Sequence, residues 1–298
     1  MESNVPTRKD VLETAKYIRQ LKKSDTPDKG FRVLITGKGG AGKTTTTALL
    51  SHIFAMQNYR VLAVDEDPQM NLPYALGLPP EKASQIVPLT QNLDYIEEKT
   101  GAQPGSGWGL MLRLNPEVED VVNRFGIEVS ERIQLLVMGT VVQAATGCLC
   151  PENSLLDAVV HHINLREKEI ILMDTQAGVE HFGRAIAKGF QQVIILTDAT
   201  FNAVQVALHS ARLAAGLGIP SRHLVINRVQ SDKDVHKVMD YIQTSGEGLF
   251  TNIFKLPFTP KLYEIEPQVA PILRNGFAPQ LLKSLLGISE TIAKYGVQ

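Results

Sequence analysis

A glycine-rich octapeptide, Gly37-Lys-Gly-Gly-Ala-Gly-Lys-Thr44, constrains the fold of this chain more than any other feature. It follows the short apolar run FRVLIT at residues 31–36, so the order is strand, loop and then helix. The octapeptide matches the pattern G-x-x-x-x-G-K-[ST], whose glycines let backbone N–H groups wrap phosphate groups at the start of a helix. The sequence therefore predicts a nucleotide-binding P-loop carried by a strand–loop–helix unit.

Each part of the P-loop has a predicted task. Lys43 is expected to contact the β- and γ-phosphates of ATP, and Thr44 is expected to place its hydroxyl on Mg²⁺. The hydroxyl of Thr45 and the neighbouring amides are expected to surround the α-phosphate, which is present in both ATP and ADP. The residues predicted to bind the nucleotide through this loop are Gly39, Gly40, Ala41, Gly42, Lys43, Thr44 and Thr45.

Six further apolar runs indicate how the rest of the chain folds. They are continuous rather than alternating, which is typical of strands covered on both faces, and helix-length segments separate most of them. This pattern predicts an α/β fold with a doubly wound, mostly parallel sheet flanked by helices. The runs lie at residues 61–64, 133–137, 170–173, 193–197, 224–226 and 252–256.

The residues before the P-loop strand form a separate region. Apolar side chains recur among charges over residues 8–23, which predicts a surface helix with one apolar stripe, and residues 24–30 have the composition of a linker. We therefore predict an N-terminal helical extension and linker over residues 1–30, and a P-loop ATPase domain over residues 31–298. The sequence leaves open whether the extension docks on another protein or packs on the ATPase core.

Charge and hydropathy limit the expected partners and location. The formal net charge of -1 provides no general attraction to nucleic acid or to anionic lipid, so neither a nucleic-acid nor a membrane partner is expected. The chain has no run of 18 apolar residues, and residues 1–29 lack the apolar stretch of a secretory signal. The expected location is cytoplasmic.

The second lysine of the P-loop, Lys38, narrows the class. With it the loop resembles the deviant Walker A box of the family that includes MinD, ParA and the nitrogenase iron protein. In that family the extra lysine reaches across a dimer interface to the partner's nucleotide. The resemblance therefore implies a homodimer bridged by nucleotide, in which Lys38 and Lys43 both serve catalysis.

The same resemblance assigns roles to three aspartates that follow apolar runs. In VLAVDEDPQMN, residues 61–71, Asp67 corresponds to the aspartate that orients the attacking water, and Asp65 to one near the Mg²⁺ shell. In IILMDTQAG, residues 170–178, Asp174 corresponds to the Walker B aspartate that holds Mg²⁺ through a water. A positioned carboxylate is enough for this chemistry, because catalysis of phosphoryl transfer is mainly geometric and electrostatic.

Two later segments resemble the family's base-binding elements. Asn227 ends the run LVIN and corresponds to the residue that contacts the edge of adenine, a task that suits an amide side chain. Pro257, in the segment LPF, corresponds to the part that lines the base.

The two cysteines of the chain, Cys148 and Cys150, form a Cys-x-Cys pair. They are too close in sequence for a stabilising disulfide, and their position before a predicted helix favours thiolates, the form that binds metal. One pair supplies two ligands, whereas a two-fold homodimer would bring four sulfurs to one ion. This chemistry leaves Zn²⁺ and Ni²⁺ open, and two buried structural cysteines are the alternative.

Several motifs together resemble the CooC family of ATPases, which help insert nickel into carbon monoxide dehydrogenase, with a sister group that serves acetyl-CoA synthase. The motifs are GSGWG (residues 105–109), MG (138–139), GCLCPEN (147–153) and DTQAGVEHFGR (174–184). The resemblance implies that Cys148 and Cys150 bind nickel at the dimer interface, with Zn²⁺ as a competitor, and that the client is one of these two apoenzymes. Two features depart from the family pattern. One is the segment of residues 1–30, and the other is Gln176, which stands where many relatives carry an acidic residue.

Two other readings use the same P-loop. A positioning or partition ATPase of the MinD or ParA kind would act on membrane or DNA, but residues 281–295 carry only Lys283 and Lys294 as basic residues. An iron–sulfur reductase like the nitrogenase iron protein would space its cluster cysteines far apart, unlike the tripeptide here.

Overall fold

The computed structural model describes residues 30–101, 118, 120–139, 150–163, 165–183, 187, 189–273 and 277–296. The predicted helix at residues 8–23, most of the glycine-rich stretch at residues 101–115, and Cys148 lie outside these described residues. The proposed division into an extension and an ATPase domain therefore stays a prediction.

An eight-stranded sheet forms the centre of the molecule, in the order β3-β4-β2-β5-β1-β6-β7-β8. All neighbours are parallel except β3 and β4, which are antiparallel. The strands are β1 Phe31–Gly37, β2 Arg60–Asp65, β3 Ile127–Ser130, β4 Ile133–Val137, β5 Glu169–Asp174, β6 Gln192–Thr197, β7 Ser221–Val229 and β8 Asn252–Pro257. This confirms the predicted doubly wound, mostly parallel α/β fold.

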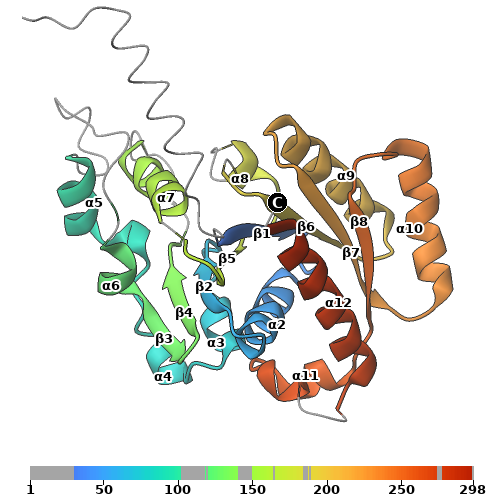
Figure 1. Cartoon of the computed structure of the whole chain (residues 1–298), viewed down its shortest axis with the longest axis horizontal. Helices are drawn as coiled ribbons and strands as arrows, with labels where there is room; N and C mark the ends of the chain where they lie inside the picture. Colours follow the sequence, from blue (N-terminus) through green and yellow to red (C-terminus); the bar gives the residue numbers. More distant parts are fainter. Residues whose placement is uncertain are drawn as a thin grey trace, which may run out of the picture.

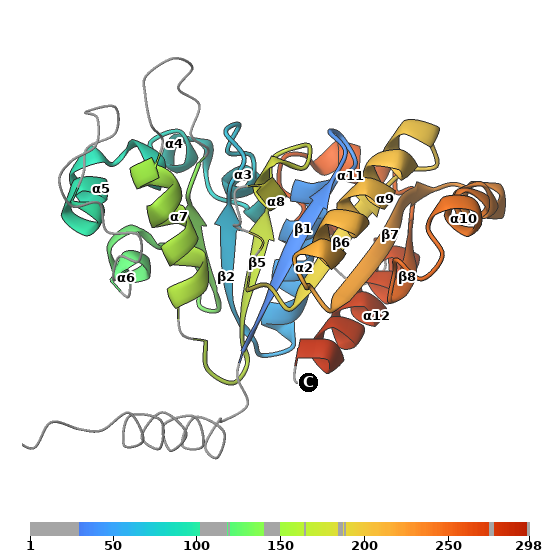
Figure 2. The same ribbon diagram turned by 90° about the horizontal axis from the view of Figure 1, so that it is seen from above.

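Helices cover both faces of the sheet (Figures 1 and 2). On one face α7 and α9 pack on a core that includes Leu155, Val159 and Leu208, and on the other α2 and α12 pack on a core that includes Leu50, Ile53 and Leu285. The helices are α2 Lys43–Met56, α3 Leu72–Leu76, α4 Pro80–Ala83, α5 Leu93–Thr100, α6 Val121–Phe125, α7 Cys150–His162, α8 Glu180–Gly183, α9 Phe201–Gly216, α10 Asp232–Ser245, α11 Lys261–Ile265 and α12 Pro279–Gly296, with 3-10 turns η1 Leu89–Gln91 and η2 Ala270–Leu273.

The central strands are buried on both faces, which explains their continuous apolar sequences. The five residues before Asp65 in β2 and before Asp174 in β5 are almost all buried, and every residue of β6 is buried. Each of the six predicted runs lies in a strand. The short edge strand β3 was not predicted, because its residues alternate between half-buried and exposed and form only four positions.

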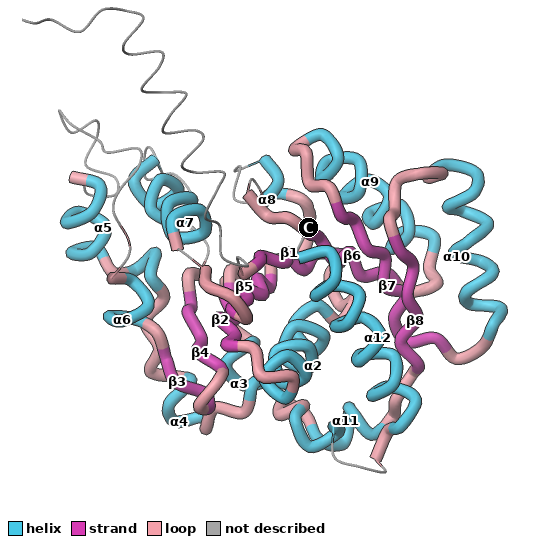
Figure 3. The backbone as a smooth tube through the Cα atoms, viewed as in Figure 1, coloured by secondary structure: helices cyan, strands magenta, loops and turns pink. Residues whose placement is uncertain are grey.

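The register of the sheet sets the position of the polar residues that follow the strands. Asp65 at the end of β2 pairs with Asp174 at the end of β5, and Asp174 pairs in turn with Ile35 of β1, two residues before Gly37. The carboxyl ends of β1, β2 and β5 therefore bring the P-loop and two aspartates to one edge of the sheet, where ligands bind in open α/β folds. The tube in Figure 3 shows the loops that follow these strands.

Candidate functional site

The P-loop joins β1 to α2, and its glycines adopt conformations that side chains disfavour. Gly40 and Gly42 have φ angles of 76° and 95°, in the left-handed region. Ala41 N donates to Lys38 O at 3.1 Å, which closes the loop into a tight turn. Gly42 is the N-cap of α2, so the first amides of the helix face the loop without a side-chain cap. This arrangement suits a phosphate group at the helix N-terminus.

Asn227, at the carboxyl half of β7, contacts the P-loop directly. Its Nδ2 donates to Ala41 O at 2.8 Å. A Cβ atom added at position 42 would lie 2.4 Å from the same Nδ2, so only glycine fits there. The predicted base-contacting residue therefore also holds the phosphate loop, a second task that the sequence did not reveal.

Asp174 lies behind the P-loop, fully buried. Thr44 Oγ1 donates to its Oδ2 at 2.6 Å, and Thr47 Oγ1 lies 3.4 Å from its Oδ1. Burial raises the pKa of Asp174 to about 7, against the opposing effects of the Thr44 hydrogen bond and the Lys43 charge. The hydroxyl and carboxylate predicted to serve Mg²⁺ thus already contact each other.

Lys43 is also largely buried, with 7% of its surface exposed. Burial lowers its pKa, while the charges of Asp174 and Asp67 act in the opposite direction. The lysine that is predicted to hold the phosphates thus faces two carboxylates in a site shielded from water, where charge interactions are strengthened.

Asp65 and Asp67 occupy different environments. Asp65 is buried, and its two carboxylate oxygens accept hydrogen bonds from Asp67 N at 3.0 Å and Leu72 N at 3.1 Å. Burial and the nearby Asp174 raise its pKa well above the ordinary range. Asp67 is half-buried, and its Oδ1 accepts from Gln69 N at 2.9 Å. Asp65 therefore fixes the turn after β2, and Asp67 is the more accessible carboxylate.

Glu66, between these aspartates, was not identified from the sequence. It is fully buried, its N donates to Asp174 O at 2.9 Å, and its Oε2 accepts from Gln176 N at 3.4 Å. Glu66 thus connects the segment after β2 with the segment after β5. The sequence showed only that a third carboxylate follows the strand. That pattern does not tell whether the side chain joins two segments or is exposed to solvent.

A narrow pocket lies beside the P-loop on the side of β7 and β8. The two predicted base-binding residues, Asn227 and Pro257, line it together with the exposed aromatic side chains Phe258 and Tyr263. Thr45 and Thr46 of α2 also border this pocket, so it is continuous with the phosphate loop. The predicted nucleotide residues therefore come together at one edge of the sheet.

The predicted metal loop is described only at its end. Cys150 begins α7, whose buried residues Leu155, Leu156 and Val159 anchor it on the sheet. Cys148 and the side chain of Cys150 lie outside the described residues. Among the described residues, no three His, Cys, Asp or Glu side chains form a ready-made metal centre.

Comparisons with known proteins decide the family. The model of the CobQ/CobB/MinD/ParA nucleotide binding domain matches residues 33–271. The chain belongs to this CobQ/CobB/MinD/ParA family. It is therefore an ATP-binding ATPase, and the matched range contains the P-loop and all three aspartates.

Within the CobQ/CobB/MinD/ParA family, the carbon monoxide dehydrogenase accessory protein CooC of Rhodospirillum rubrum is 35% identical over 70% of this chain and 79% of its own length. An uncharacterised ATP-binding protein of Methanocaldococcus jannaschii is 37% identical over the same shares. These relatives make the chain a CooC-like ATPase of the MinD and ParA class, as the motifs predict.

Solved structures of the family confirm the fold. The cell division ATPase MinD of Pyrococcus furiosus has a TM-score of 0.62 at 21% identity, covering 89% of this chain and 99% of that chain. MinD from the MinC:MinD complex of Aquifex aeolicus has a TM-score of 0.61 at 18% identity, covering 89% and 96%. At such identities the likeness concerns the fold alone.

No described helix is long and apolar enough to span a membrane.

Proposed function

We propose that this CooC-like ATPase is a nickel-handling accessory protein for carbon monoxide dehydrogenase or acetyl-CoA synthase. The observation that carries the proposal is its 35% identity to the accessory protein CooC over most of both chains. The Cys148-x-Cys150 pair adds the thiolate chemistry that nickel accepts. Nickel is here the cargo, and nucleotide turnover is what changes the protein between a holding and a releasing form.

The nucleotide site fits Mg–ATP by its donor set. Backbone amides of the P-loop and Lys43 would hold the phosphates, and Thr44 and Asp174 would hold Mg²⁺, which prefers oxygen ligands and retains several waters. When bound, Mg²⁺ would neutralise charge on the phosphate oxygens. Asp67, the accessible carboxylate, would orient the attacking water, and Asp65 would keep the Asp67 turn in place through its two backbone hydrogen bonds.

The proposal includes a homodimer closed around nucleotide. Lys38 is half-buried at the start of the loop and would reach the nucleotide of the partner subunit. Two copies would also supply four thiolates to one ion, enough for Ni²⁺ or Zn²⁺. Lys38→Ala should therefore leave ATP binding to one chain nearly intact while it removes hydrolysis and ATP-dependent dimerisation, as measured by mass in solution. Full hydrolysis by this variant would contradict the shared site.

Equilibrium metal binding tests the nickel assignment. We expect one Ni²⁺ per two chains, with an affinity that changes between nucleotide-free, ADP-bound and ATP-bound protein. Cys148→Ala with Cys150→Ala should abolish metal binding and keep ATP affinity, whereas Lys43→Ala should do the reverse. Unchanged nickel binding by the cysteine variant would exclude the site, and a strong preference for Zn²⁺ would exclude nickel as the cargo.

A MinD-like or ParA-like role on membrane or DNA is the alternative, but no described feature favours it. The residues of α12 that would form an apolar membrane-binding face, including Leu281, Leu285 and Ile288, are buried against the sheet. Sedimentation with liposomes or plasmid DNA at physiological salt would revive this alternative.

A further inference from the structure

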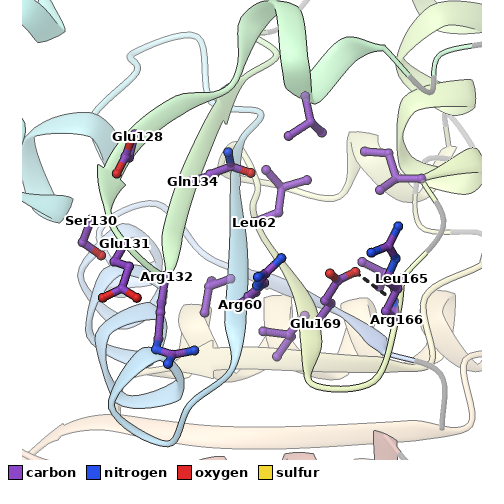
Figure 4. Close-up of a pocket in the computed structure, with 14 residues that line it drawn as sticks. Arg60, Leu62, Glu128, Ser130, Glu131, Arg132, Gln134, Leu165, Arg166 and Glu169 are labelled. Carbon is purple, nitrogen blue, oxygen red and sulfur yellow. Dashed lines mark hydrogen bonds between the residues drawn. The ribbon is translucent and has the colours of Figure 1, made fainter.

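A pocket lies at the edge of the sheet opposite the nucleotide site (Figure 4). It has a volume of about 680 Å³. Arg60 is the first residue of β2, Glu169 is the first of β5, and Arg132 directly precedes β4, so the pocket surrounds the amino ends of these strands. Val122 of α6 and Leu165, just after α7, close its other side. We call it the amino-edge pocket.

The amino-edge pocket has an apolar floor and a charged rim. Leu62 lies at its centre in Figure 4, and Val122, Ile163 and Leu165 add further apolar surface. Three arginines and three glutamates line the rim, namely Arg60, Arg132, Arg166, Glu128, Glu131 and Glu169. Within the part of the chain that the structure describes, the three arginine side chains form no ion pair. Such a rim can accept both the basic and the acidic side chains of an amphipathic partner.

Helices cover the sheet face around this pocket only in part. Leu136 and Met138 of the β4 segment are buried beneath the layer of α7, whereas Gln134, on the same face, is exposed and lines the pocket. Glu128 of β3, which pairs with Gln134, is exposed as well. The helical layer on this face therefore stops short of the amino end of β4 and the carboxyl end of β3, which lie side by side.

The described chain begins at the rim of this pocket. A Cβ atom added at Gly30 would lie 2.1 Å from Glu169 O, 2.6 Å from Arg166 O and 2.8 Å from Leu165 Cβ, so the backbone of Gly30 packs tightly against three lining residues. The described chain therefore starts at Gly30, directly beside the opening of the pocket. The linker of residues 24–29 reaches up to ~20 Å when extended, enough to bring a preceding helix over the pocket.

The sequence of residues 8–23 matches what the pocket offers. At helical spacing Val11, Ala15 and Ile18 share one face, with Leu21 beside them. Six basic and two acidic residues surround this stripe. We propose that residues 8–23 dock as an amphipathic helix in the amino-edge pocket of their own chain, with Ile18 over Leu62 and the charged side chains paired with the rim.

A photo-crosslinking experiment on the full chain tests the docking. Benzoylphenylalanine replaces Ile18 in one protein and Gln20 in another, because Gln20 lies on the opposite face of the predicted helix. We expect adducts from position 18 to map by mass spectrometry to Leu62, Val122, Gln134 or Leu165 within the same chain, at a yield that is independent of protein concentration. Position 20 should give these adducts only at background.

Hydrogen exchange provides a second readout that does not need a crosslink. Ile18→Glu places a charge on the apolar stripe and should increase the exchange of amides in residues 121–137, while the matched control Gln20→Glu adds the same charge on the opposite face and should not. Three results would overturn the proposal: equal exchange in both variants, crosslinks between two chains, which would make a second copy the occupant, or no pocket adducts, which would leave the pocket to another protein.

Discussion

Burial favours the neutral form of titratable groups at both edges of the sheet, but these groups are acids at one edge and a base at the other. At the carboxyl edge, burial raises the pKa of two carboxylates, Asp65 and Asp174. Near the amino edge, burial lowers the pKa of His223 to about 4. At the carboxyl edge, the environment favours the neutral form of the carboxylic acids until a cation binds. Near the amino edge, both ring nitrogens of the neutral His223 have hydrogen-bond partners. The carboxyl edge thus carries the nucleotide site, whereas the buried His223 near the amino edge serves stability.

The environment of His223 supports this contrast. Its Nε2 lies 3.1 Å from Gln192 Oε1 and its Nδ1 lies 3.1 Å from Asn252 Nδ2, so the neutral ring with a proton on Nε2 satisfies both partners. Gln192 Nε2 donates to Ile292 O at 2.9 Å, which fixes the orientation of the amide. These contacts join the first residues of β6 and β8 to β7 and α12.

Removal of Lys43 should have the largest effect. Lys43→Ala leaves Asp174 and Asp67 without the buried cation between them, and it removes the side chain that is predicted to hold the phosphates. We expect hydrolysis to fall by about 100-fold or more. ATP turnover and nucleotide titration measure this loss, with Lys237→Ala on the exposed face of α10 as the control. Near-normal turnover would show that the carboxyl edge does not work as described.

Gly42→Ala should have the next largest effect. The new methyl group would clash with Asn227 Nδ2, and a φ of 95° is strained for alanine. We expect ATP affinity to fall by roughly 10-fold or more, since a strained position costs on the order of 1–3 kcal/mol. The double variant Gly42→Ala with Asn227→Ala removes the clash but not the strain. It should therefore recover little, and full recovery would show that backbone conformation is unimportant there.

Asp174→Asn should separate stability from activity at the carboxyl edge. The unfolded carboxyl ionises near pH ~4, and the folded one near pH 7. Between these values the folded chain holds more protons, so stability falls as pH rises and the loss is complete above pH 7. Nucleotide-free and Mg²⁺-free Asp174→Asn should thus melt a few degrees higher than wild type at pH 8, and at the same temperature near pH 4. Its Mg²⁺-dependent hydrolysis should be lost. A lower melting temperature at pH 8 would contradict the raised pKa.

His223→Gln should reveal the smaller, opposite dependence at the amino edge. The unfolded histidine takes up a proton near pH ~6.5, but the folded one only near pH 4. Stability therefore falls as pH drops through this window, because the unfolded chain binds more protons. Urea unfolding from pH 7.5 to 4.5 should show a steeper loss for wild type than for His223→Gln. Parallel curves would mean that His223 does not titrate as its environment implies.

The sequence predicted the parts of this molecule that depend on local pattern. Continuous apolar runs located every strand except β3, and the P-loop residues were recognisable because one backbone shape requires those glycines. It missed β3, an edge strand of four residues that is specified by pairing with β4 rather than by its own composition. It also missed Glu66 and the second task of Asn227, since both depend on contacts between segments more than 100 residues apart.

Arg32 joins the amino end of β1 to the carboxyl end of α7. Arg32, the second residue of β1, donates through Nε to Val160 O at 2.9 Å, in the last turn of α7, and through Nη2 to Ile163 O, just after the helix ends. Strand β1 therefore leads into the phosphate loop at its carboxyl end and, near its amino end, holds α7 through the hydrogen bonds of Arg32. Over its 13 residues the helix is ~20 Å long, so this contact lies at the end of the helix that is remote from Cys150. Strand β1 thus connects the phosphate loop to the carboxyl end of the helix that begins at Cys150.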